Sequence, residues 1–150
     1  MMLDADDRFA LQELVNRYPY HLDLWQIDAW ADLFTANGVL DESALGMGTY
    51  EGRRAIAAYG AELEADVLHV VHLMMNHVLL DCDANRVTGS VFALVEANTR
   101  SAGHARYYIR YEDIYVRTVT GWQFDKRAET SMLAELSISS FSEDSVPSRQ

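Results

Sequence analysis

The chain has 150 residues, a hydrophobic fraction of 49%, a charged fraction of 23% and a formal net charge of −11 at pH 7. These values are typical of one globular domain, and the acidic charge argues against a nucleic-acid partner or an anionic membrane surface. The single cysteine, Cys82, excludes a disulfide within the chain and a cysteine-based metal site.

The first residues, Met-Met-Leu-Asp-Ala-Asp-Asp, are acidic, whereas a signal peptide begins with basic residues. No apolar run approaches the length of a membrane-spanning helix. We therefore expect a cytoplasmic protein that binds neither nucleic acid nor membrane.

The first part of the chain has the pattern of an amphipathic helix. Asp4, Asp6 or Asp7 can cap it, and acidic residues suit the positive end of a helix. Pro19 lies within the helical pattern and has no N–H group, which predicts a kink or break near Tyr18. The apolar stripe at helical spacing consists of Leu11, Leu14, Val15, Tyr18 and Leu22.

Four shorter segments are expected before the long strands. A second helix over residues 27–34 is followed by a turn at Asn37 and Gly38. Residues 39–45 are predicted to form a short strand, residues 46–52 a loop and residues 53–64 a third helix.

The second half is predicted to be a meander of long strands, over residues 66–80, 87–99, 105–118 and 122–129. Helices followed by antiparallel strands indicate an α+β domain over residues 1–132, in which a curved sheet packs on the helices and encloses a pocket. The polar residues 133–150 are expected to form a partly flexible tail. Because a broad apolar and aromatic sheet face rarely stays exposed, we also expect a homo-oligomer.

Three of the five histidines lie in the apolar strand over residues 66–80. Because side chains alternate along a strand, His72 is expected to lie opposite His69 and His77. Histidines on opposite faces, without an acidic cluster, do not predict a metal site, and no cofactor is expected. A polar group in so apolar a strand needs a hydrogen-bonding partner. The face of His72 is predicted to carry Met74, Asn76, Val78 and Leu80.

Asp23 is a carboxylate with apolar neighbours and is the partner we predict for His72. Taken alone, Asp23 could cap the next helix, and His72 could be a satisfied core histidine. Together they can act as a unit, because an aspartate that accepts from one ring nitrogen fixes the histidine tautomer and raises the basicity of the other nitrogen. Such a base can remove a proton from carbon.

Arg127 on the last strand could stabilise negative charge that develops during a reaction. Its alternative role is an edge-strand charge that discourages aggregation. Alternation places it opposite Trp122 and Phe124, so an inward Arg127 requires a bulge. Tyr18 is first of all a core residue, but its hydroxyl can reach the pocket. Further candidate contacts with a substrate are Tyr20, Trp25, Asn76, Glu96, Tyr107 and Tyr111.

These features resemble the SnoaL-like domains of the NTF2-like superfamily, whose α+β cone is also called cystatin-like. The resemblance covers about residues 5–130. It depends on Asp23, on His72 at the start of a long strand, and on the segments over residues 11–14, 48–53 and 121–127.

Within the superfamily, the chain is most similar to scytalone dehydratase and hexachlorocyclohexane dehydrochlorinase, which are cofactor-free lyases with a His–Asp pair. The resemblance implies that His72 is the base, that Asp23 is its partner and that Arg127 lies near the leaving group. It also gives Asn76 a counterpart in the dehydrochlorinase and implies a trimer or a dimer.

The chain departs from both relatives. The dehydrochlorinase has a lysine where this chain has Tyr18, and the fungal dehydratase has a second pocket histidine where residues 95–98 contain none. The resemblance therefore implies a dehydratase-like lyase that acts on a small cyclic or aromatic hydroxylated substrate of unspecified identity. Two alternatives remain: an isomerase or polyketide-cyclase reaction without a departing group, and a non-catalytic module that binds a small ligand.

Overall fold

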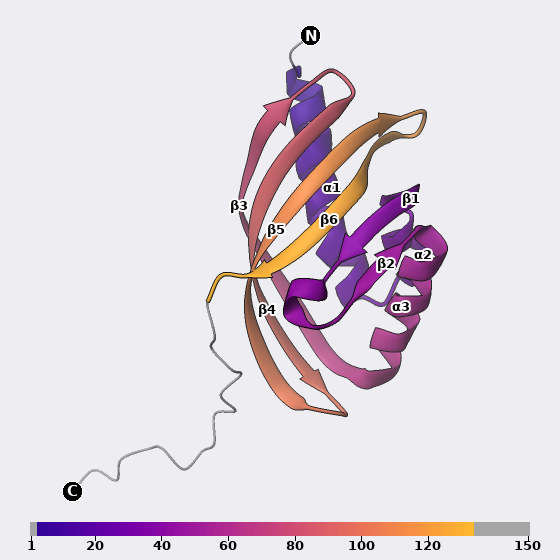
Figure 1. Cartoon of the computed structure of the whole chain (residues 1–150), viewed down its shortest axis with the longest axis vertical. Helices are drawn as coiled ribbons and strands as arrows, with labels where there is room; N and C mark the ends of the chain where they lie inside the picture. The colour runs from indigo at the N-terminus through magenta and orange to yellow at the C-terminus, as the bar shows by residue number, and fades with distance from the viewer. Residues whose placement is uncertain (1–2, 134–150) are drawn as a thin grey trace, which may run out of the picture.

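A curved sheet of six strands wraps around three helices in the computed structural model, which describes residues 3–133 (Figure 1). The helices are α1 (Ala5–Asp23), α2 (Ile27–Ala31) and α3 (Arg53–Asp66), with a short 3₁₀ helix, η1, at Ser43–Leu45. The strands are β1 (Phe34–Asp41), β2 (Thr49–Glu51), β3 (Val67–Cys82), β4 (Arg86–Thr99), β5 (Gly103–Thr118) and β6 (Gly121–Ser131).

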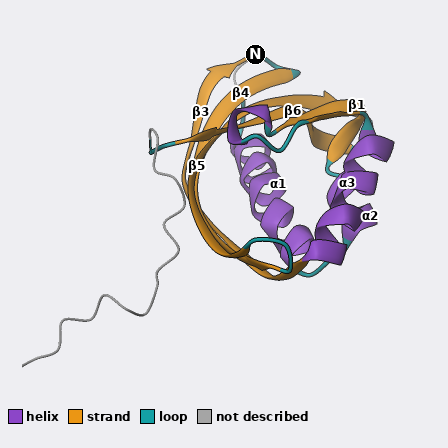
Figure 2. Cartoon of the chain, turned by 60° about the horizontal axis from the view of Figure 1, so that its bottom comes forward, coloured by secondary structure: helices purple, strands orange, loops and turns teal. Residues whose placement is uncertain are grey.

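The strands lie in the order β2-β1-β6-β5-β4-β3. Strands β1 and β6 run parallel, and the other neighbouring pairs run antiparallel. Figure 2 shows the long strands curving around α1 and α3, so that one face of the sheet covers the helices. The predicted α+β class with a mixed, curved sheet is confirmed.

The first helix is capped and buried as its sequence predicts. Asp4 accepts a hydrogen bond from the backbone N–H of Asp7 at 2.8 Å, and the apolar stripe lies in the core. The predicted break is wrong, because α1 continues through Pro19 to Asp23. Pro19 is itself buried, and the burial of its ring offsets the hydrogen bond that proline cannot donate.

The segment between α1 and α3 contains less helix and more strand than predicted. The second helix ends at Ala31, and β1 begins at Phe34 and passes through the expected turn. The reason lies at Gly38, where a Cβ would be 3.0 Å from the carbonyl oxygen of Phe124, so only glycine lets β1 approach β6 this closely. The strand predicted over residues 39–45 ends at Asp41, and the predicted loop contains β2.

A bulge in β3 changes which residues share the face of His72. The pairing with β4 shifts between Met75 and Val78, and Asn76 has a φ of 55°. An extra residue in a strand reverses the alternation beyond it. His77 and Leu79 are therefore turned inward with His72, whereas Asn76, Val78 and Leu80 are exposed. The predicted face is correct for Met74 but wrong beyond it, and the predicted separation of His72 from His77 is wrong.

A second bulge lies in β6 and turns Arg127 inward. Phe124 pairs with Tyr115 but Lys126 pairs with Ile114, which leaves Asp125 as the extra residue. Phe124 is buried before the bulge and Arg127 after it. This is the bulge that an inward Arg127 required, and the alternative role of Arg127 as an exposed edge charge does not hold.

The described elements occupy residues 5–131, within the predicted domain of residues 1–132. The tail predicted over residues 133–150 lies, apart from Leu133, outside the described residues. Over residues 3–133, no helix is long and apolar enough to cross a membrane. The face of the sheet that is turned away from the helices exposes a row of apolar side chains on β3: Leu68, Val71, Leu73, Met75, Val78 and Leu80.

Candidate functional site

The predicted pair of Asp23 and His72 is formed between the end of α1 and the first half of β3. Asp23 Oδ1 lies 2.5 Å from His72 Nδ1, and Asp23 Oδ2 accepts the backbone N–H of His72 at 2.8 Å. The side chains of His72 and Asp23 keep 10% and 18% of their surface exposed. Both carboxylate oxygens are thus used to hold one residue of the sheet.

This two-point contact determines which ring nitrogen of His72 can accept a proton. With Nδ1 donating to Asp23, the neutral ring has its lone pair on Nε2. The second contact, to the backbone of the same residue, prevents the carboxylate from rotating away. A histidine oriented in this way, with a carboxylate beside it to balance the charge, has the arrangement of a general base.

Tyr18 separates this pair from a second polar group deeper in the core. Its ring is edge-on to the His72 ring, with 6.5 Å between the centroids. On its other side the guanidinium carbon of Arg127 lies 4.2 Å from the Tyr18 centroid. The same carbon lies 4.3 Å from the Tyr111 centroid and 4.2 Å from that of Phe124, so three rings enclose the cation.

Arg127 forms a buried ion pair with Asp113, and both side chains are 0% exposed. Its Nε and Nη2 donate to the two carboxylate oxygens at 2.8 and 2.7 Å. Burial opposes the charge on Arg127, but Asp113 outweighs burial, so the pKa of Arg127 is raised and the group stays protonated.

A chain of hydrogen bonds leads from this ion pair to the edge of the sheet. Tyr115 donates to Asp113 at 2.7 Å, and its hydroxyl lies 3.2 Å from His77 Nε2. His77 Nδ1 lies 3.1 Å from the side-chain oxygen of Gln12 on α1. Burial lowers the pKa of His77, and the nearby charge of Asp113 partly opposes this shift.

Two buried glutamates near Arg127 were not predicted from the sequence. Glu42 follows β1 and Glu129 lies on β6, with exposed fractions of 6% and 5%. Tyr59 on α3 donates to Glu42 Oε2 at 2.6 Å, and the pairing of Asp41 with Ala128 places Glu42 beside Glu129. Burial raises the pKa of both, and the charge of Glu42 raises that of Glu129 further. The sequence signal is the spacing of Glu129 from Arg127, two positions along one strand face.

Some buried polar atoms have no hydrogen-bond partner among the described residues. They are Trp30 Nε1, the Tyr111 hydroxyl and Arg127 Nη1. Buried polar atoms nearly always have partners, so the Tyr111 hydroxyl, which lies across from Glu129, and Arg127 Nη1 are candidates to bind a polar atom of a ligand.

The other predicted substrate contacts do not lie together: some are exposed and others pack against the core. Tyr20 is 60% exposed, and Asn76 is exposed on its bulge. Trp25 has a φ of 56° in the turn after α1 and packs against the core. Tyr107 is half-buried on β5, also against the core, and burial raises its pKa. Glu96 forms an ion pair with Arg106.

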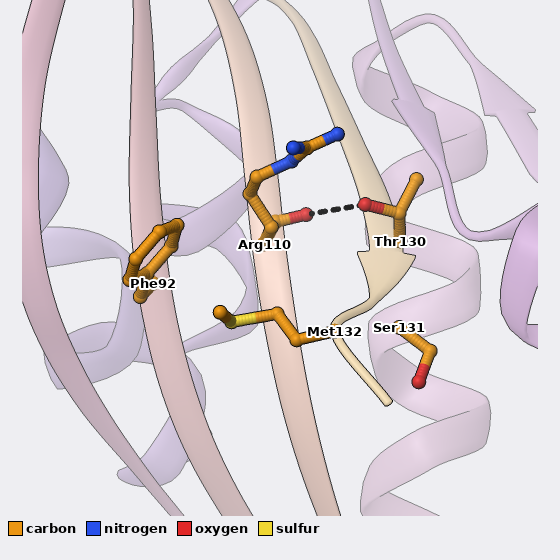
Figure 3. A pocket seen from close by; sticks show the side chains of 5 residues that line it. All are labelled: Phe92, Arg110, Thr130, Ser131 and Met132. Carbon is orange, nitrogen blue, oxygen red and sulfur yellow. Dashed lines mark hydrogen bonds between the residues drawn. The ribbon is translucent and has the colours of Figure 1, made fainter. Parts of the chain in front are cut away.

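Two hollows lie on the face of the sheet that is turned away from the helices. The first, of about 300 Å³, is lined by Phe92, Arg110, Thr130, Ser131 and Met132, with Thr130 donating to the carbonyl of Arg110 (Figure 3). The second, of about 560 Å³, shares Phe92 and Arg110 with it. Neither is lined by the Asp23–His72 pair, so we place the candidate site on the inner face. Within residues 3–133 no three metal-ligating side chains converge.

A family model for the SnoaL-like domain matches residues 4–128. No curated protein matches the chain. A protein from Novosphingobium aromaticivorans that is provisionally named an aromatic ring hydroxylase is 22% identical, with a TM-score of 0.83 over 87% of this chain and 92% of that one.

Two further solved structures are also similar. A protein from Novosphingobium aromaticivorans, provisionally named a scytalone dehydratase, is 19% identical, with a TM-score of 0.75 over 84% of each chain. A hexachlorocyclohexane dehydrochlorinase from Novosphingobium barchaimii is 20% identical, with a TM-score of 0.75 over 84% of this chain and 86% of that one. Other matched structures are described as NTF2-like and cystatin-like, which confirms the predicted fold.

Proposed function

The chain belongs to the SnoaL-like domain family, and we propose that within this family it is a cofactor-free lyase of the dehydratase type. The observation that supports this most directly is the contact of both Asp23 oxygens with His72, at 2.5 and 2.8 Å. The similar structures include a dehydrochlorinase and a protein that is provisionally named a dehydratase, which also supports the proposal.

In the proposed reaction, His72 Nε2 removes a proton from carbon of a small cyclic or aromatic hydroxylated substrate. Asp23 keeps the ring in the required tautomer and balances the charge of the imidazolium. The fixed charge of Arg127, which acts across the Tyr18 ring, favours the negative charge that develops on the substrate. Of the further candidates, Tyr107 is the side chain we propose as a substrate contact, because it lies half-buried against the core.

The same base can serve an isomerase or a polyketide-cyclase reaction, in which no group departs. The mass of the product distinguishes these reactions, because loss of water supports the lyase and an unchanged mass supports the isomerase. A non-catalytic module would bind a ligand without changing it.

The test compares His72→Ala and Asp23→Asn with the unaltered protein on a panel of cyclic β-hydroxy ketones and hydroxylated aromatic compounds. Since general-base catalysis contributes a factor of about 10² to 10⁴, we expect turnover to fall by at least about 100-fold in both variants. His69→Ala is the matched control, because His69 lies on the same strand but is exposed. Turnover that survives both His72→Ala and Asp23→Asn would contradict the assignment.

We also propose that the protein is a homo-oligomer, a dimer or a trimer. The support is the apolar row on the outer face of β3, in which Leu73 alone has 53% of its surface exposed. Exposed apolar surfaces of this kind commonly mark protein contacts.

A further inference from the structure

We propose that the pair formed by Glu42 and Glu129 is the general acid of the candidate site on the inner face of the sheet, and that it gives a proton to the departing hydroxyl group of the substrate. This inference rests on the proposed function, and it adds a proton donor to a reaction in which His72 is the acceptor.

The fold places the two carboxyl groups side by side. Strands β1 and β6 are parallel neighbours in which Asp41 pairs with Ala128, so Glu42, which follows β1, is brought beside Glu129 of β6. Both are almost fully buried, with exposed fractions of 6% and 5%. Among the ion pairs of residues 3–133, none involves either glutamate.

Two adjacent buried carboxyl groups that form no ion pair favour a state with one shared proton, because burial and mutual repulsion each disfavour the second charge and the nearby charge of Arg127 only partly opposes this. Tyr59 donates to Glu42 Oε2 at 2.6 Å, which occupies that oxygen as an acceptor. The shared proton therefore lies between Glu42 and Glu129. Burial raises the pKa of both groups, in agreement with this arrangement.

The pair and the base belong to one interior. Burial raises the pKa of Glu42, and the nearby charge of His72 partly opposes this shift. Burial also raises the pKa of Tyr18, whose ring is edge-on to His72, and the charges of Glu129 and Glu42 raise it further. Because a positive charge favours the ionised form of a nearby carboxyl group, a proton that arrives on His72 makes the pair a stronger acid.

Two unpartnered atoms show where the departing oxygen would bind. Tyr111 pairs with Glu129 across β5 and β6, and Arg127 lies two residues before Glu129. The Tyr111 hydroxyl and Arg127 Nη1 are buried and have no hydrogen-bond partner within the described part of the chain. Both can donate to one oxygen atom and hold it beside the glutamates.

Neither of these two groups can supply the proton itself. Burial raises the pKa of Tyr111 well above its ordinary value, and the neighbouring Asp113 raises that of Arg127 despite its burial. They can only orient the oxygen. A carboxylic acid is the group in this interior that can release a proton near neutral pH.

The proposed step balances. The C–H bond breaks and its proton goes to His72 Nε2, while its electron pair forms the new C=C bond. The C–O bond breaks, and the oxygen leaves with the bonding pair and takes the proton of the glutamate pair to form water. His72 is then protonated and the glutamate pair carries one more negative charge. Proton transfer from His72 to the pair through the water just formed restores the initial state.

The first test measures the shared proton directly and needs no substrate. Infrared spectra of the protein near neutral pH should contain the C=O band of a protonated carboxyl group. Glu42→Gln and Glu129→Gln, which keep the size of the side chain, should each shift this band, and the double variant should remove it. Glu112→Gln, at an exposed glutamate of β5, should keep it. A spectrum of the unaltered protein without this band would overturn the inference.

The second test separates the acid from the base by the leaving group. The two probes are a cyclic β-hydroxy ketone and its β-nitrophenoxy counterpart, whose nitrophenolate departs without a proton. Glu42→Gln should lower the turnover of the hydroxy ketone by about 100-fold or more and that of the nitrophenoxy ketone by only a few-fold. His72→Ala should slow both.

The outcomes distinguish the two proposals. If Glu42→Gln slows both ketones equally, or neither, the glutamate pair is not the proton donor, whereas the loss of both reactions in His72→Ala still supports the base. If His72→Ala leaves both reactions unchanged, the proposed function itself is wrong. Melting curves of each glutamine variant verify that it is folded.

Discussion

The ion pair of Arg127 and Asp113 should stabilise the fold only when both partners are present. Both side chains are 0% exposed, and two hydrogen bonds of 2.8 and 2.7 Å join them. Removing one partner leaves an uncompensated buried charge, which costs about 3–5 kcal/mol. In Asp113→Leu the Tyr115 hydroxyl also loses its acceptor, which adds about 1 kcal/mol. We therefore expect Asp113→Leu to lower the free energy of unfolding by about 4–6 kcal/mol.

The double variant Asp113→Leu/Arg127→Met should be much more stable than this single variant. Replacing a buried ion pair by apolar groups of similar volume is often neutral or stabilising. Here the single cation that the three rings enclose is also lost, at about 0.5–2 kcal/mol, although the sulfur of methionine recovers part of this. We expect the free energy of unfolding of the double variant to be about 2–4 kcal/mol higher than that of Asp113→Leu.

Urea titration of the unaltered protein, the two single variants and the double variant measures the coupling. Because about 1 kcal/mol corresponds to roughly 2–4 °C in a domain of this size, Asp113→Leu should also melt at least about 8 °C lower. Glu112→Gln on the same strand controls for a change of charge at an exposed site. If the effects of the single variants simply add in the double variant, the rings rather than Asp113 hold Arg127 in place, and the reasoning fails.

Three further predictions concern β3. Burial lowers the pKa of His77, so the unfolded chain binds its proton more readily; stability should therefore fall as the pH drops below about 6.5, and a pH series of urea titrations should show a smaller fall in His77→Gln. Asn76 has a φ of 55°, so Asn76→Gly should keep the stability of the fold, whereas Asn76→Val should lower the free energy of unfolding by about 1–2 kcal/mol; equal melting temperatures would contradict this. Leu73→Asp places a charge on the exposed apolar row, and in sedimentation it should shift the protein to a lower mass; a monomeric unaltered protein would refute the proposed assembly.

The pairing of Asp23 with His72 could be predicted because each residue is polar within an apolar segment. A buried polar group needs a partner, and the order of helices before strands limits where that partner can lie. The contact at 2.5 Å agrees with this reasoning. The same reasoning could not determine that Asp23 also binds the backbone of His72, because that depends on how the end of α1 meets β3.

The two bulges could not be placed by alternation alone. Asn76 belongs to the few residue types that tolerate a positive φ, so its identity carried a weak signal for the bulge in β3. Asp125 carries no such signal. Each bulge reverses the face of every residue beyond it. Because the bulge in β3 was not predicted, His77 was assigned to the wrong face, and because the bulge in β6 was not predicted, the inward direction of Arg127 stayed open.

The unplaced bulge in β6 also explains why the buried glutamates were not predicted. Glutamate is rarely buried, so without the bulge Glu129 reads as a solvated residue near the end of an edge strand. Once Arg127 is known to point inward, Glu129 must follow it, and the parallel pairing of Asp41 with Ala128 then brings Glu42 alongside. The burial of the two glutamates could therefore be predicted only if the register of β6 against its neighbouring strands were known, and that register depends on tertiary packing.

Exposure divides the interior charges into two kinds with different possible roles. Arg127 and Asp113 are 0% exposed, so they cannot exchange protons with a substrate, but their field acts at short range in a medium of low dielectric. His72 and Asp23 keep 10% and 18% of their side-chain surface, which leaves His72 accessible to a carbon-bound proton of the substrate. The charge of Arg127 stays fixed, whereas the protonation state of His72 changes in every turnover. Under the proposed function, this explains why the pair between helix and sheet is left partly open while the pair between two central strands is sealed by three aromatic rings.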